Sequence, residues 1–147
     1  MKNSIHNLGT SYSRISRDEF LEQTVLLVAQ RSTCLRLQVG SLVARDGRIL
    51  VTGYNGAPAG MPHCQPAFCG PDKPCIRTVH AEANCIAFAA KHGISLDGAF
   101  MYSTDSPCIE CAKLIINAGI KGLHYQRPYR DEFPIKYLVE AGVLTIL

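Results

Sequence analysis

Three side chains that could bind one metal ion stand at the start of two segments expected to be helical. His80 precedes the mostly apolar run 83–90, and Cys108 and Cys111 precede the similar run 112–118; neither run contains Gly or Pro. Residues three apart share a helix face, so the two thiols can hold one ion, and the positive ends of both helix dipoles favour thiolate there. Two sulfur ligands and one nitrogen ligand suit Zn²⁺ and leave a fourth position open.

Glu82 lies two residues after His80 and is not needed as a ligand. Beside a zinc ion that acidifies water, a carboxylate can take a proton, pass it to a ring nitrogen and later deliver one to a leaving amine. This chemistry is hydrolytic deamination of an amidine-like carbon, such as C4 of cytosine. The order His-x-Glu then Pro-Cys-x-x-Cys also matches the signature of zinc-dependent nucleobase deaminases. The alternatives are a redox cysteine pair and a structural zinc, and a purely structural site has no use for Glu82.

The composition indicates a single globular domain. The chain has 147 residues, of which 47% are hydrophobic and 18% charged, so we expect one domain over 1–147 with a loose lead-in at 1–15. No apolar run is long enough to span a membrane, and the first residues lack the apolar core of a signal peptide, so we expect a cytoplasmic protein. The net charge of +3 is small and dispersed, which favours a small anionic ligand over nucleic acid.

Strands and helices alternate along the chain. Ser16 and Glu19 form a capping box for a helix running to about Arg31, and its inner side is expected to carry Phe20, Leu21, Thr24, Val25, Leu27 and Val28. Strands are expected at 38–44 and 49–54, joined by a tight turn. The stretch 55–74 is irregular and rich in Gly, Pro and Cys.

The second half of the chain repeats the alternation more regularly. The ligand helices are expected at about 78–92 and 108–118, further strands at 99–104, 122–126 and 142–147, and a last helix at 131–141. This order predicts an α/β sheet with helices on both faces and its last three strands parallel.

Several segments resemble the deoxycytidylate (dCMP) deaminase family. They are CLRLQVG (34–40), TGYNGAPAG (52–60), IRTVHAEAN (76–84) and PCIECAKLIINAGI (107–120), and the likeness covers about 16–147. It implies a three-layer α/β/α cytidine-deaminase-like fold around a five-stranded mixed sheet, and hydrolysis of dCMP to dUMP and ammonia, which supplies dUMP for thymidylate synthesis. The alternatives are a deaminase of dCTP or of a 5-modified dCMP, and a tRNA adenosine deaminase. The last would need a basic face and stacking aromatics, and the chain has no Trp.

The resemblance also implies residue roles. His80, Cys108 and Cys111 would bind zinc, and Glu82 would shuttle protons. Substrate contacts would come from the backbone of Ala81, from Asn55 and from Asn84. The alternative for Asn84 is an ordinary polar helix residue, and its match with the family motif favours contact. The candidates for holding the 5′-phosphate, each arginine having a solvated surface charge as its alternative, are Arg31, Ser32, Arg36, Tyr129 and Arg130.

Family members are often hexameric, activated by dCTP with Mg²⁺ and inhibited by dTTP. The segment associated with that control is matched here by Gly53, Tyr54, Asn55, Gly56 and Gly60. We therefore expect a homo-oligomer, with a hexamer favoured, and Mg²⁺ only together with a nucleotide effector. Asp105 departs from the family pattern, which commonly has an apolar residue there, and an acid so near the zinc would alter the electrostatics of the pocket.

Four further cysteines could form a second metal site: Cys34, Cys64, Cys69 and Cys75. Four thiols fit a closed structural zinc site, and some members of the family have a second zinc in the matching regions. His63 could replace one thiol, and free thiols are the alternative. The remaining cysteine, Cys85, is expected to be a small buried apolar residue.

Overall fold

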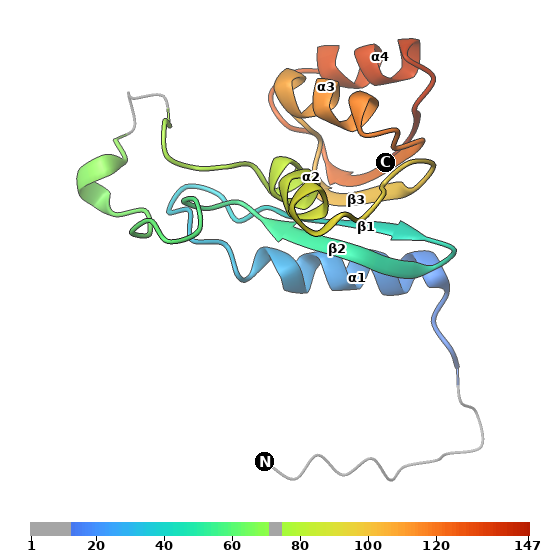
Figure 1. Ribbon diagram of the computed structural model, residues 1–147, viewed down its shortest axis with the longest axis horizontal. Coiled ribbons are helices and arrows are strands. Elements are labelled where there is room, and N and C mark those ends of the chain that lie inside the picture. The colour runs from blue at the N-terminus through green and yellow to red at the C-terminus, as the bar shows by residue number, and fades with distance from the viewer. Residues whose placement is uncertain (1–12, 71–74) are drawn as a thin grey trace, which may run out of the picture.

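The computed structural model describes residues 13–70 and 75–147, which form one sheet with helices on both faces (Figure 1). In chain order the elements are α1 (Arg17–Ala29), β1 (Gly40–Arg45), β2 (Arg48–Tyr54), the 3₁₀ turn η1 (Pro66–Phe68), α2 (Ala81–His92), β3 (Phe100–Asp105), α3 (Ile109–Asn117), β4 (Gly122–Arg127), α4 (Phe133–Glu140) and β5 (Leu144–Ile146). The predicted α/β fold with a five-stranded mixed sheet is confirmed. Most of the expected lead-in, residues 1–12, lies outside the described residues.

The strand order across the sheet is β2-β1-β3-β4-β5. β1 is antiparallel to both of its neighbours, whereas β3, β4 and β5 are parallel, as predicted. The turn between β1 and β2 has positive φ angles at Asp46 and Gly47, which suits the twist of a two-residue hairpin. Because β3 and β4 are parallel, their last residues, Asp105 and Arg127, are paired at the same edge of the sheet.

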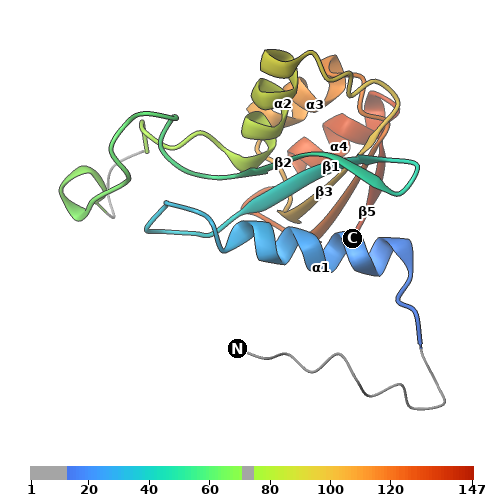
Figure 2. The same cartoon turned by 60° about the horizontal axis from the view of Figure 1, so that its bottom comes forward.

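α1 covers one face of the sheet (Figure 2). It begins as predicted, because the Ser16 hydroxyl accepts a hydrogen bond from the Glu19 N–H at 3.1 Å. The prediction of its inner side was partly wrong. Phe20 and Leu27 are 45% and 65% exposed, while the buried residues recur at every fourth position: Leu21, Val25 and Ala29. A single narrow stripe is enough to cover one side of β1 and β3.

α2, α3 and α4 lie on the opposite face, where the larger core sits (Figure 2). Its fully buried members include Val43, Cys85, Met101, Ala112, Ile115, Leu123 and Leu138. The burial of Cys85 confirms the prediction for that residue. A Cβ atom added at Gly53 of β2 would lie 2.6 Å from the carbonyl oxygen of Ala81. The first turn of α2 therefore rests directly on β2, which fixes where α2 begins.

Candidate active site

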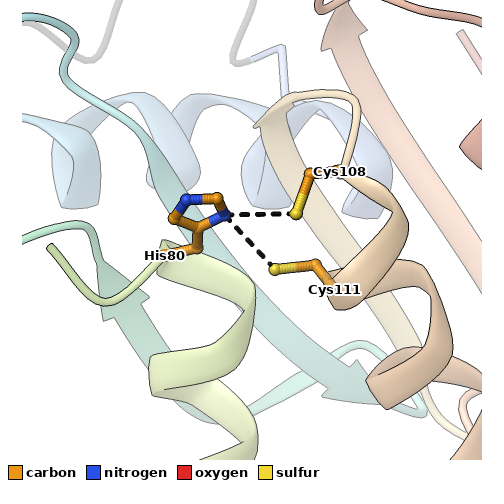
Figure 3. Close-up of side chains that lie close together, drawn as sticks. All are labelled: His80, Cys108 and Cys111. Atoms are coloured by element: carbon orange, nitrogen blue, oxygen red, sulfur yellow. Dashed lines mark hydrogen bonds between the residues drawn. The ribbon is translucent and has the colours of Figure 1, made fainter. Parts of the chain in front are cut away.

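His80 and Cys108 occupy equivalent positions, each as the N-cap residue of its helix, α2 and α3. Neither side chain caps its own helix, so both are free to meet each other. His80 Nδ1 lies 3.4 Å from Cys108 Sγ and 3.5 Å from Cys111 Sγ (Figure 3). All three ligand atoms lie within 4.8 Å of one another, and no other such group of His, Cys, Asp or Glu occurs in residues 13–70 and 75–147.

This donor set fits Zn²⁺, which takes imidazole nitrogen and thiolate sulfur in tetrahedral sites. The two thiols already differ in acidity. The hydrogen bond between them holds the pKa of Cys108 well below its ordinary value, and the same bond raises the pKa of Cys111. Cys108 therefore carries negative charge at the start of α3, where the helix dipole also stabilises an anion.

Glu82 lies in the first turn of α2 and is only 4% exposed. Burial raises its pKa to about 7; the charge of His80 works in the opposite direction, while those of Cys108 and Asp105 add to the increase. At neutral pH such a group can both accept and donate a proton. Its position beside His80 and Cys108 places that exchange at the metal site.

The site opens into a cavity of about 900 Å³. His80, Glu82 and Cys108 form part of its wall, so the three-ligand site has an accessible side. Of the residues predicted to contact substrate, the cavity wall includes Arg36, Asn55, Ala81, Tyr129 and Arg130. The volume suits a nucleotide-sized ligand.

Hydrogen bonds to other residues of the chain use most of the hydrogen-bonding capacity of the Asn55 side chain. Its side-chain oxygen accepts hydrogen bonds from the Ser32 hydroxyl at 2.6 Å and from the Val39 N–H at 2.9 Å, and its amide donates to the Leu37 carbonyl at 2.8 Å. One amide hydrogen therefore remains for a ligand. Asn55 also fixes the segment between α1 and β1, which contributes Arg36 to the cavity.

Tyr129 and Arg130 follow β4 and are fastened to the loop that carries the cysteine ligands. The Tyr129 N–H donates to the Ser106 hydroxyl at 2.7 Å, and the Ser106 N–H donates to the Arg127 carbonyl at 2.8 Å. The guanidinium group of Arg130 lies over the Tyr129 ring, 4.9 Å from its centroid. The segment after β4 and the metal site are thus parts of one hydrogen-bonded unit.

The family model of the cytidine and deoxycytidylate deaminase zinc-binding region matches residues 15–126 of this chain. The chain belongs to this deaminase family. The resemblance noted from the sequence is confirmed, and Zn²⁺ as the metal is supported both by the family and by the donor set.

Similar proteins span most of the chain. ComE operon protein 2 of Bacillus subtilis is 42% identical over 134 residues, covering 90% of this chain and 71% of that protein. The deoxycytidylate deaminase of Enterobacteria phage T4 is 35% identical, covering 76% and 78%. A crystal structure of dCMP deaminase from the cyanophage S-TIM5 in complex with dCMP and dUMP has a TM-score of 0.82 and 34% identity, covering 92% of this chain and 98% of that one.

Three of the substrate contacts predicted by likeness to the deaminase family do not line the cavity: Arg31, Ser32 and Asn84. Ser32 acts on Asn55, as described above. The Asn84 amide donates to the Tyr54 carbonyl at 2.7 Å and so links α2 to β2. Conversely, the cavity wall includes Asp105, an acid that the sequence placed near the zinc but not among the substrate contacts.

Of the four cysteines proposed for a second metal, Cys64 and Cys75 contact the same residue, and Cys34 and Cys75 line the same cavity. Cys64 Sγ is 3.5 Å from the Thr78 hydroxyl, and Cys75 Sγ accepts the Thr78 N–H at 3.4 Å. Cys34 and Cys75 both line the cavity. Within the described part of the chain these cysteines do not form a group of three with mutually close sulfur atoms, so the second site stays a prediction.

The glycine-containing segment matched to effector control has clear packing roles. Gly53 and Tyr54 end β2, and Gly56 forms an isolated bridge with Val79. A Cβ atom at Gly56 would lie 2.3 Å from the Thr33 hydroxyl, whereas Gly60 has open space and a φ of 83°. All three glycines thus have a structural reason in the fold of this deaminase, Gly53 and Gly56 by close packing and Gly60 by its positive φ. None of the described helices is long and apolar enough to cross a membrane.

Proposed function

We propose that the protein is a zinc-dependent dCMP deaminase, which converts dCMP and water into dUMP and ammonia. The observation that carries this proposal is a buried Glu82 beside the group His80, Cys108 and Cys111, on the wall of a nucleotide-sized cavity. Relatives named deoxycytidylate deaminase support the choice of substrate, as does the S-TIM5 enzyme with dCMP and dUMP bound. The product would feed thymidylate synthesis.

Zn²⁺ held by these three residues would supply the Lewis acidity that makes water a nucleophile at neutral pH. Glu82 carries both protons of that water. It delivers the first to ring nitrogen N3 and the second to the 4-amino group, while the new C4–O bond forms and the C4–N bond breaks. The product therefore keeps a proton on N3 and the amine leaves as ammonia. The pKa of about 7 at Glu82 suits both transfers.

The remaining cavity residues would orient dCMP. The backbone of Ala81 meets the pyrimidine carbonyl, and the last amide hydrogen of Asn55 reaches the base or deoxyribose. Arg36, Tyr129 and Arg130 would hold the 5′-phosphate, since a cavity wall with two guanidinium groups favours an anion. Arg31 and Ser32 lie outside the cavity wall. Only Ser32 would contribute indirectly, through its hydrogen bond to Asn55.

A panel of substrates tests the proposal. Ammonia release should be measured from dCMP, dCTP, 5-methyl-dCMP, deoxycytidine and an adenosine-containing RNA stem-loop. We expect a higher kcat/KM for dCMP than for dCTP, deoxycytidine or the stem-loop, because dCMP combines the 4-amino group with a single 5′-phosphate. A higher kcat/KM for 5-methyl-dCMP would make a 5-modified dCMP the substrate. If dCTP or the stem-loop had the higher kcat/KM, that compound and not dCMP would be the substrate.

A second, structural zinc is part of the proposal, bound by Cys34, Cys64, Cys69 and Cys75. The shared contact of Cys64 and Cys75 with Thr78 supports it, as do the free thiols of all four. The segment 55–70 contributes no buried apolar side chain that could hold it in place, so a metal there would stabilise it. Metal analysis should give two zinc ions per chain, and a value of one would exclude the second site.

We also propose that the chain works as a single domain in a cytoplasmic homo-oligomer, with a hexamer favoured. The segment 53–60 would receive dCTP with Mg²⁺ as activator or dTTP as inhibitor. It begins at the end of β2 and contains the cavity residue Asn55, so an effector there could act on the cavity. Sedimentation tests the oligomeric state, and a monomer would exclude the oligomer. The rate of dCMP turnover with and without dCTP and Mg²⁺, or with dTTP, tests the control, and a rate that neither nucleotide changes would exclude it.

A further inference from the structure

Asp105 ends β3 beside the metal site and is held by two donors. Arg127, its partner in the parallel β3–β4 ladder, lies 2.9 Å from Asp105 Oδ2 through Nη2. The Thr104 hydroxyl donates to the same oxygen at 2.7 Å and itself accepts the Gly40 N–H at 3.2 Å. Both donors bond the same oxygen, Oδ2.

The second oxygen of this carboxylate, Oδ1, has no hydrogen-bond partner among the described residues. Oδ1 accepts no hydrogen bond from any residue in the described part of the chain, although Asp105 is only 6% exposed and lines the cavity. Oδ1 is not one of the fully buried atoms that lack a partner in the described residues, so it takes its hydrogen-bond donor from its surroundings. The donor can come from the cavity, which is where a ligand sits.

The chemistry of the proposed substrate limits what that donor can be. The cytosine ring of dCMP has one hydrogen-bond donor, its 4-amino group, because N3 and O2 are acceptors. The phosphate is an anion and would be repelled by Asp105 but attracted by Arg36 and Arg130 on the same cavity wall. The charges of the cavity therefore turn the amine towards Asp105 and the phosphate towards the arginines.

We propose that Asp105 is a specificity-determining residue whose Oδ1 accepts a hydrogen bond from the 4-amino group of the substrate. This inference rests on the proposed function and adds a contact to it. In the product the same ring position carries a carbonyl oxygen, which is an acceptor. Two acceptors facing each other in a partly buried site repel, so Asp105 disfavours dUMP relative to dCMP. The carboxylate thus selects the amine and promotes release of the product.

The alternative is that Asp105 only links β3 to β4 through Arg127. The two explanations differ in what they predict for Arg127, which does not line the cavity. A linking role makes the two side chains equivalent, because each variant breaks the same ion pair. A contact with the base makes Asp105 alone responsible for distinguishing an amine from a carbonyl.

The test compares ligand binding in zinc-loaded protein that carries Glu82→Gln, so that dCMP is not consumed. Isothermal titration gives Kd for dCMP and for dUMP, with and without Asp105→Asn. The amide can donate to the product carbonyl, so we expect the ratio Kd(dUMP)/Kd(dCMP) to fall by about tenfold or more. With Arg127→Gln instead, the ratio should stay within about twofold while the melting temperature falls.

An unchanged ratio in Asp105→Asn, or an equal fall in Arg127→Gln, would overturn the proposal. If Asp105→Asn does not fold, Asp105→Ser removes the same charge and carries the same expectation. Failure of the proposed function is a separate result, because it would appear as absent dCMP turnover by the wild-type protein whatever the binding ratio.

Discussion

His80 Nδ1 lies 3.4 Å from Cys108 Sγ, although 28 positions separate the two residues in the chain. Each residue immediately precedes a helix, and the two helices, α2 and α3, lie next to each other on one face of the sheet. The fold thus brings two helix N-termini together around one donor set.

Replacing Cys108 by Ala removes one of three ligands and should lower the zinc content by one ion per chain and abolish turnover. Cys85→Ala is the matched control, because Cys85 is a buried cysteine of the main core and not a ligand. It should keep the zinc and lose about 1 kcal/mol of unfolding free energy. Metal analysis and urea unfolding on both variants check this, and equal zinc contents would refute the assignment of Cys108.

Asn55→Ala should destabilise the protein by about 2–4 kcal/mol, because it leaves the Val39 N–H and the Leu37 carbonyl without their partner. The Ser32 hydroxyl loses the side-chain oxygen but keeps the backbone carbonyl of residue 55 as an acceptor. Ser32→Ala removes a single hydroxyl and should cost about 1 kcal/mol. Urea denaturation gives both values. An Asn55→Ala protein as stable as the wild type would mean that the segment between α1 and β1 is held by other contacts.

Arg130→Ala should raise KM for dCMP at least about tenfold, since it removes a charged partner of the phosphate, and should leave the zinc content unchanged. Arg31→Ala is the matched control: Arg31 follows α1, is exposed and does not line the cavity. Its KM should be that of the wild type. Steady-state kinetics give KM for both variants. Equal KM values would show that Arg130 does not bind the phosphate.

Gly53→Ala should destabilise the protein by about 1–3 kcal/mol even without any nucleotide, because the new Cβ atom meets the Ala81 carbonyl and the Cys85 N–H at under 3 Å. Displacement of α2 would also move His80 and weaken zinc binding. Thermal melting in nucleotide-free buffer measures the first effect. If the variant melts like the wild type and loses only its response to effectors, the packing role of Gly53 is wrong.

The sequence predicted the elements because its local signals agree with the tertiary structure. The Ser16 cap, the hairpin at Asp46 and Gly47, and the end of α2 at Gly93 with a φ of 66° all follow from residue chemistry. The start of α2 was placed three residues too early. His80 is extended, with φ −69° and ψ 153°, because Val79 pairs with Gly56, and that contact is not visible in the local sequence.

The metal ligands and Glu82 could be identified by their spacing in the sequence. The other cavity residues have no such spacing and could be named only through the resemblance to the deaminase family. Arg36, Asn55 and Tyr129 reach the cavity from three separate segments. The sequence does not distinguish Arg31 from Arg36, because only the path of the chain after α1 decides which of the two lines the cavity. The pairing of Asp105 with Arg127 depends on the register of two parallel strands, for which no short motif exists.

We propose that Glu82 moves the protons in a reaction that uses zinc bound by His80, Cys108 and Cys111. Zinc content and dCMP turnover should be measured on the same preparation of Glu82→Gln, next to the wild type. We predict an unchanged number of zinc ions per chain and a kcat lower by about 10²–10⁴-fold. A variant that keeps its zinc and still deaminates dCMP at the wild-type rate would contradict the account.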